Sequence, residues 1–167
     1  ADGRIPRVPA APMTIVHLGL FSKVRGWPQV LDALSMSDAR VRLQVIGTIN
    51  DGTGDAFDAR VRELGLQDRV TVHEWMPFEE AFDLLLQADV GLIAFQPHIQ
   101  NHIFAMPHKL FDYMAAGMSV LMPKQAVEVA PIVEETRCGL LYGPSDPQDL
   151  SRQIGRLLEN PDEAQKM

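Results

Sequence analysis

The chain has 167 residues, of which 46% are hydrophobic, and it carries a formal net charge of -7 at pH 7. This length and composition support one compact domain with a sizeable core, and the excess of acidic side chains argues against a nucleic-acid partner because it gives no basic field for phosphates. The sequence contains no apolar run near the roughly 20 residues that cross a bilayer and no signal-peptide pattern. Together with a single cysteine, Cys138, this favours a soluble protein of the reducing cytoplasm.

The first residues differ in composition from the rest. Residues 1–13 contain three prolines, two arginines and no hydrophobic period, which predicts an extended linker from a missing N-terminal domain. We expect the folded domain to occupy residues 14–167. Its charged tail after Leu158 ends without a natural stop, which suggests that the sequence is cut there.

Short apolar runs then alternate with stretches of helical period along the chain. The runs are apolar at successive positions, as expected when helices cover both faces of a sheet. The pattern predicts an α/β fold with a doubly wound, Rossmann-like parallel sheet of about six strands. The expected strands are Thr14–Leu18, Val41–Ile46, Val70–Val72, Val90–Ala94, Ser119–Met122 and Gly139–Leu141.

Several helices have recognisable ends. Proline is favoured in the first turn, acidic residues stabilise the positive end of the helix dipole, and glycine permits the left-handed stop. These signals predict helices over Trp27–Ser35 with Pro28 near its start, from Glu79 and Glu80 to Leu86, over Pro107–Ala116 with Gly117 as its stop, and from about Asp146–Gln148 to Leu158.

The loop after the first expected strand is a candidate anion site. It runs from Gly19 to Pro28, contains Lys23 and Arg25, and ends at the start of a helix. Free amides, the helix dipole and Arg25 together suit a diphosphate. The loop lacks the glycine patterns of dinucleotide and Walker sites; taken alone it favours a tight turn with solvated cations.

A second candidate follows the fourth expected strand. The long loop Phe95–Met106 leads into a helix with Lys109 in its first turn and Asp112 one turn later. Loops of this length in compact domains are usually functional. Lys109 suits a phosphate and Asp112 suits vicinal hydroxyls of ribose. The alternative is an intrahelical ion pair between these two side chains at the surface.

At these residues the sequence resembles the retaining glycosyltransferases of family 4 (glycosyl transferases group 1) and their relatives with the GT-B architecture. The resemblance covers nearly all of Thr14–Glu159, and six or more weak motifs in family order are hard to obtain by chance. The motifs are His17-Leu18-Gly19 with Arg25-Gly26, Val45-Ile46-Gly47, Leu64 to Val70, Trp75-Met76-Pro77, Ala88 to Leu92, Pro107 to Gly117 and Gly139 to Pro147.

The resemblance implies the C-terminal, donor-binding half of a hexosyltransferase, inactive without its N-terminal acceptor domain. It places Gly19, Arg25 and Lys109 at the donor diphosphate, Asp112 at the ribose, Met76 and Pro77 at the nucleobase, and Phe104, Ala105, Met106 and His108 in a loop at the donor sugar or cleft. It implies a nucleotide-sugar donor as substrate, no metal or other cofactor, and membrane contact only through the missing half. Catalytic residues are not assigned.

Two departures from the family pattern leave other functions open. Phe104 stands where the first glutamate of the E-x7-E motif contacts the donor sugar, and Leu20 replaces a frequent basic residue. In a subset of the family with a Pro-x-Lys-Leu-Phe-Glu-Tyr-like segment, Lys109 supplies that charge. A sugar-nucleotide epimerase of the GT-B fold and a non-catalytic GT-B-like binding or scaffold module remain alternatives.

Other polar residues carry weaker signals. His98, His102 and His108 match no established zinc spacing, and we expect one of them to line the donor cleft instead. His17 is expected to be half-buried. The segment Asn50–Asp55 has the composition of a plain turn, and Glu128, Glu134 and Glu135 suit a solvated helix face, although Glu128 also lies where a family glutamate can approach the ribose.

Overall fold

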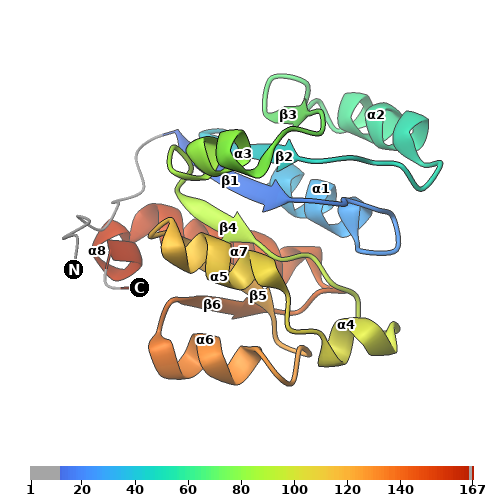
Figure 1. Ribbon diagram of the computed structural model, residues 1–167. Helices are drawn as coiled ribbons and strands as arrows, with labels where there is room; N and C mark the ends of the chain where they lie inside the picture. The colour runs from blue at the N-terminus through green and yellow to red at the C-terminus, as the bar shows by residue number, and fades with distance from the viewer. Residues whose placement is uncertain (1–11, 166) are drawn as a thin grey trace.

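The computed structural model describes residues 12–165 and residue 167. Its centre is a single sheet of six parallel strands in the order β3-β2-β1-β4-β5-β6 (Figure 1). The predicted doubly wound α/β fold is therefore confirmed. The strands are β1 (Met13–Leu18), β2 (Val41–Ile46), β3 (Val70–His73), β4 (Val90–Leu92), β5 (Ser119–Pro123) and β6 (Gly139–Tyr142).

The strand order reverses between β1 and β4. β1 pairs with β2 along its whole length, from Met13 beside Val41 to Leu18 beside Ile46. It pairs with β4 only through Ile15 and Val16. Loops that leave β1 and β4 therefore turn to opposite faces of the sheet, which opens a crevice at their carboxyl ends. This crevice is the place where a ligand is expected in such a sheet.

Helices cover both faces of the sheet (Figure 1). α3, α5 and α6 share one core cluster with the sheet, and α1, α2 and α7 share the other. The helices are α1 (Trp27–Met36), α2 (Gly54–Glu63), α3 (Phe78–Leu85), α4 (Gln100–Phe104), α5 (His108–Ala115), α6 (Ala130–Thr136), α7 (Pro147–Glu159) and α8 (Pro161–Gln165).

α5 is fixed to the sheet by Tyr113, which is fully buried. Its hydroxyl accepts the Leu18 N–H at 2.9 Å and donates to the Leu92 carbonyl at 3.2 Å. The ring lies directly over Gly91 in β4, so close that a Cβ on Gly91 would overlap it. Tyr113 thus joins the ends of β1 and β4 where these strands diverge.

Some element ends differ from the sequence-based expectations. β1 begins at Met13, whose side chain is buried and whose N–H donates to the Arg40 carbonyl at 3.1 Å. β4 ends at Leu92 rather than Ala94. α5 begins at His108, because Pro107 is extended and forms its N-cap. Such shifts of one or two residues are common at element ends.

Two further expectations need correction. The segment 50–55 is more than a turn, because α2 already begins at Gly54. His17 is fully buried rather than half-buried. The exposed side chains of Glu134 and Glu135 do lie on α6, whereas Glu128 precedes that helix.

The expected linker 1–13 lies mostly outside the described residues, since the structure describes the chain only from Pro12. Among the described residues, no helix combines the length and apolar character needed to cross a membrane.

Candidate functional site

A pocket of about 330 Å³ lies at the carboxyl ends of β1, β2 and β3. It brings together three residues that the sequence analysis assigned to a donor nucleotide: Gly19 after β1, Met76 after β3 and Asp112 on α5. The lining residues are Leu18, Gly19, Ile46, Gly47, Trp75, Met76, Phe78, Ala81 and Asp112. Pro77 is the exposed N-cap of α3 beside this pocket and does not line it.

Trp75 lines the pocket but was missed as a site residue by the sequence analysis. Its side chain is 77% exposed, although tryptophan usually buries most of its surface. Phe78, which also lines the pocket, is 53% exposed. The signal in the sequence was a large aromatic residue two positions after the carboxyl end of a strand. Together these rings give one wall of the pocket an apolar, aromatic surface that suits a planar base.

The loop between β1 and α1 is held in place by its own backbone and by its neighbours. The Arg25 N–H donates to the Ser22 carbonyl at 3.1 Å, and the Lys23 N–H donates to a carboxylate oxygen of Asp51 at 2.7 Å. Asp51 in turn accepts from the Thr53 hydroxyl at 2.6 Å. The loop is therefore ordered by contacts that do not involve any ligand.

Gly26 closes this loop in a left-handed conformation, with φ of 101°. A Cβ at this position would overlap the side-chain amide of Gln96, which follows β4 and donates to the Pro144 carbonyl at 3.2 Å. Glycine alone adopts this left-handed conformation without strain and also leaves room for the Gln96 amide. Gln96 thereby connects the loops that follow β1, β4 and β6.

Arg25 stands over the ring of Phe95, with 5.8 Å from Cζ to the ring centroid. The same ring stacks on His102 with centroids 4.8 Å apart. His102 is buried and accepts the Gln96 N–H at 3.1 Å through Nδ1, and burial lowers its pKa. The Arg25 guanidinium thus lies over the ring of Phe95, which stacks on His102. Among the described residues Arg25 forms no ion pair.

Lys109 points toward the β1 loop rather than toward Asp112. Its Nζ lies 3.3 Å from Nε2 of His17 and 3.6 Å from the place where a Cβ on Gly19 would stand. Burial and the positive charge of Arg25 lower the pKa of Lys109 to about 7. The alternative of a surface ion pair between Lys109 and Asp112 is therefore wrong: the described residues form no such pair.

Asp112 lies one turn beyond Lys109 and faces the pocket. Its side chain is partly exposed, and burial raises its pKa, while the neighbouring His108 opposes this rise. Without an ion pair among the described residues, its carboxylate oxygens can accept hydrogen bonds from a ligand.

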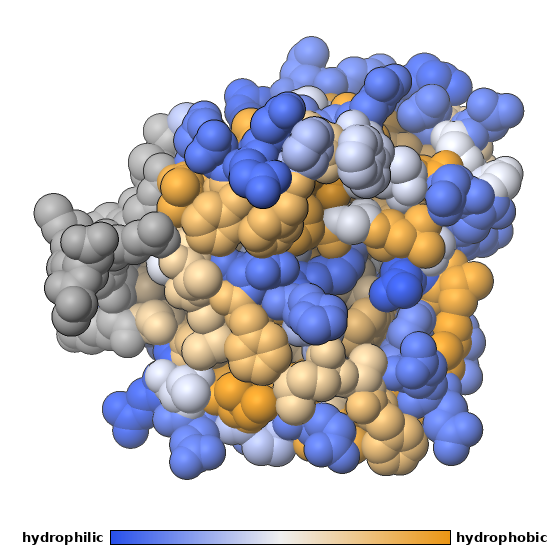
Figure 2. All heavy atoms as spheres, viewed as in Figure 1, coloured by the Kyte–Doolittle hydropathy of each residue, from blue (hydrophilic) through white to orange (hydrophobic). Residues whose placement is uncertain are grey.

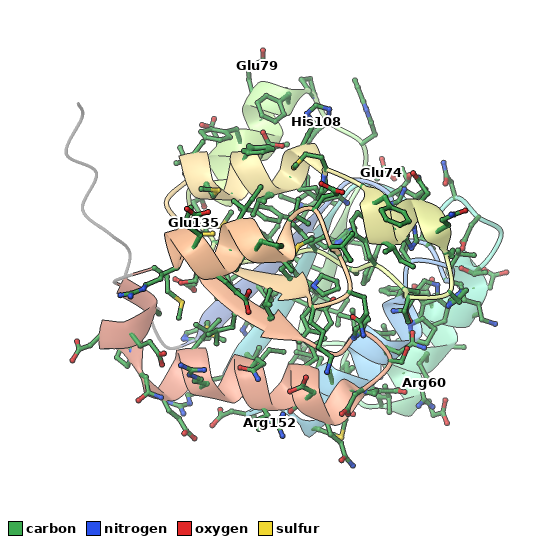
Figure 3. The ribbon with its side chains drawn as sticks, turned by 90° about the horizontal axis from the view of Figure 1, so that it is seen from below. Arg60, Glu74, Glu79, His108, Glu135 and Arg152 are labelled. Carbon is green, nitrogen blue, oxygen red and sulfur yellow. The ribbon has the colours of Figure 1, made fainter. Side chains whose placement is uncertain are left out.

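The remaining predicted cleft residues do not line the pocket. Phe104 ends α4 and is 56% exposed, Ala105 follows as its C-cap, and Met106 is also exposed. His108 is the exposed first residue of α5 and points outward in Figure 3. Figure 2 shows apolar side chains over α3 and α5; the exposed Phe78 and Phe111 belong to these helices.

Another hollow, of about 400 Å³, lies between α1, α2 and the start of α7. Its cation, Arg60, already pairs with Asp32 at 2.7 Å. This hollow therefore lacks an unpaired basic side chain, whereas Arg25 and Lys109 are unpaired among the described residues near Gly19. The chemistry available at the first pocket is the binding of an anion next to an aromatic wall and a hydrogen-bond-accepting carboxylate.

Comparison with known proteins identifies the family of the chain. The profile of the family "Glycosyl transferases group 1" matches residues 12–160. The chain belongs to this family. A comparison with curated proteins finds no match.

Solved structures similar to this glycosyl transferases group 1 chain share its fold. The C-terminal domain of the group 1 protein LpcC from Francisella tularensis has a TM-score of 0.78 and 17% identity, over 92% of this chain and 79% of that one. HepE from Anabaena, solved with UDP and glucose, has a TM-score of 0.77 and 20% identity, over 92% of this chain and 41% of that one. Sucrose-phosphate synthase from Thermosynechococcus elongatus has a TM-score of 0.70 and 24% identity, over 92% of this chain and 38% of that one.

Proposed function

We propose that this chain is the donor-binding domain of a retaining, hexosyl-transferring enzyme that moves a sugar from a nucleoside diphosphate sugar to an acceptor. The observation that carries this proposal is the pocket that joins Gly19, Met76 and Asp112, with the Lys109 amine beside Gly19. Among the similar structures, HepE was solved with UDP and glucose and with UDP-glucose. The chain spans 41% of HepE, so the acceptor pocket belongs to a second domain in this proposal.

In this proposal the base lies against Trp75 and Met76, the ribose hydroxyls donate to Asp112, and the diphosphate lies between Arg25 and Lys109. The pocket lining contains both the apolar side chains and the carboxylate. The chain contributes positioning and stabilisation of the departing diphosphate, which are the main sources of catalysis in such transfers. The two cations supply the positive charge, so we propose that no metal is required and that the reaction belongs to the cytoplasm.

We expect the isolated chain to bind one of UDP, GDP and ADP with a dissociation constant well above 1 μM. In this proposal a second domain supplies the other half of the cleft, so fewer contacts offset the cost of association. Calorimetric titration with the three nucleotides, with Mg²⁺ and with EDTA, measures this directly. We expect the same affinity under both conditions.

The outcomes of this titration separate the alternatives. Submicromolar affinity would show that the site is complete within this chain. No binding of any of the three nucleotides would favour a scaffold module over a donor-binding domain. A requirement for Mg²⁺ would contradict the role given to Arg25 and Lys109.

We expect Asp112→Asn to weaken ribonucleotide binding by tenfold or more. An amide is a poorer acceptor than a carboxylate, and hydrogen bonds to charged groups contribute about 1.5–3 kcal/mol. The same substitution should change the affinity for a 2′,3′-dideoxynucleotide little, because that ligand has no ribose hydroxyls. Comparing the two ligands isolates the contact.

Glu79→Gln is the matched control, because Glu79 is an exposed acid on the adjacent helix α3 and points away from the molecule in Figure 3. It should leave both affinities unchanged. Equal losses for the two ligands in Asp112→Asn would make Asp112 a structural residue.

A further inference from the structure

His17, which is fully buried, and Lys109, which is half-buried, form a basic pair beside the β1 loop. His17 is fully buried at the end of β1, its ring packs on Phe21 with centroids 4.5 Å apart, and its Nε2 lies 3.1 Å from the Leu20 carbonyl. The same Nε2 lies 3.3 Å from Lys109 Nζ. The diphosphate-binding role proposed for Lys109 requires only a positive charge. That role does not explain why the amine contacts a buried imidazole.

The groups around Lys109 do not compensate a positive charge. Facing it are His17 on β1, Arg25 on the β1–α1 loop and His102 on α4, and His98 lies near His102. Two titratable residues share helix α5 with Lys109. His108 is exposed, and Asp112 forms no ion pair with Lys109 within the described part of the chain. Burial and then Lys109 lower the pKa of His17 well below its ordinary value, so the imidazole stays neutral.

A lysine in this setting changes its charge near neutral pH. Burial disfavours the ammonium form, and Arg25 repels it. These two effects lower the pKa of Lys109 to about 7, in that order of importance. A diphosphate between Arg25 and Lys109 reverses the second effect, because its negative charge favours the ammonium form.

We infer that donor binding at this site is coupled to protonation: above neutral pH the Lys109 amine of the empty site is largely uncharged beside His17, and the arriving diphosphate draws one proton from solvent onto Nζ. This inference rests on the proposed function of the site. The proton comes from water or buffer, no covalent bond between heavy atoms forms, and the ammonium produced contacts the phosphate oxygens.

The pH dependence follows from the direction of this change. Binding raises the pKa of Lys109 above its value of about 7 in the empty site. The affinity is therefore highest below pH 7 and falls as the pH rises between the free and the bound pKa. One linked proton gives a loss of up to about tenfold per pH unit in that interval.

The first measurement uses the ligand-free chain. Carbon-13 NMR of the lysine Cε signals, with Lys109 assigned by its loss in Lys109→Arg, should show Lys109 titrating near pH 7. An ordinary value for Lys109 would overturn the inference without touching the proposed function.

The second measurement counts protons during binding. UDP-, GDP- and ADP-glucose are suitable probes, because both phosphates of each are diesters that do not titrate near neutral pH. Calorimetry at pH 8 in buffers of different ionisation enthalpy should give an uptake approaching one proton per donor bound, and an uptake near zero at pH 6.

Variants separate the two proposals. Lys109→Arg keeps a permanent cation and should bind the donor without proton uptake, whereas Lys23→Ala should keep the uptake of the unmodified chain. Donor binding with no uptake from pH 6 to pH 9 would overturn the coupling alone. Failure of all three donors to bind at any pH would contradict the proposed function as well.

Discussion

Gly91→Ala is expected to destabilise the fold strongly. An added Cβ would overlap the ring of Tyr113, which is fully buried and cannot move without breaking its bonds to Leu18 and Leu92. Overpacking of this kind typically costs 1–3 kcal/mol and occasionally more, and we expect about 3 kcal/mol or above because the neighbour is rigid. Urea denaturation monitored by circular dichroism measures the loss.

Gly155→Ala is the matched control, since Gly155 lies inside α7 and nothing is within 4 Å of its added Cβ. It should increase stability by about 0.5–1 kcal/mol, the usual gain for alanine over glycine in a helix. In the Gly91→Ala background, Tyr113→Leu should restore part of the lost stability, although alone it destabilises. A cost below about 1 kcal/mol for Gly91→Ala would show that the ring of Tyr113 is freer than its bonds suggest.

Arg25→Ala and Lys109→Met are expected to produce the largest losses of nucleoside diphosphate binding. Arg25 lies on the β1 loop and Lys109 lies beside it, and each variant removes a basic side chain that forms no ion pair among the described residues. Charge-assisted hydrogen bonds contribute about 1.5–3 kcal/mol, so each variant should bind at least about tenfold more weakly. Calorimetry with the diphosphate that binds best gives the comparison.

Two controls distinguish lost charge from lost structure. The nucleoside without phosphates should bind both variants as it binds the unmodified chain, and the exposed Lys23→Ala should leave diphosphate binding unchanged. Lys109→Met should also raise the melting temperature, because it removes an amine whose charge is disfavoured by burial. Equal losses for nucleoside and diphosphate would remove Arg25 or Lys109 from the phosphate site.

The sheet could be predicted because short runs rich in apolar residues are separated from one another by stretches of helical period, although β2 carries the exposed Arg42 and β3 is only partly buried. Val41–Ile46 even has the predicted ends. Helix α4 could not be predicted, because it has only five residues and no side-chain cap at Ile99. A helix of that length forms only through its surroundings, here the burial of His102 against Phe95.

Some residues of the candidate pocket could be predicted from the sequence, but Trp75 and the contacts between the residues could not. Gly19, Met76 and Asp112 come from three separate loops or helices that the parallel topology brings to one edge. The direction of Lys109 depends on the space beside Gly19 and on buried His17, which no local pattern reveals. Sequence spacing alone pointed to Asp112, because residues three apart on a helix are neighbours.

The hydroxyl of Tyr113 has a consequence for domain motion. It joins α5, which carries Lys109 and Asp112, to the end of β1, from which the Arg25 loop departs. The two sides of the pocket therefore cannot hinge against each other without breaking a buried hydrogen bond. If the proposed function is correct, we expect closure over a donor to be a rigid-body approach of a second domain toward this pocket, rather than a rearrangement within it.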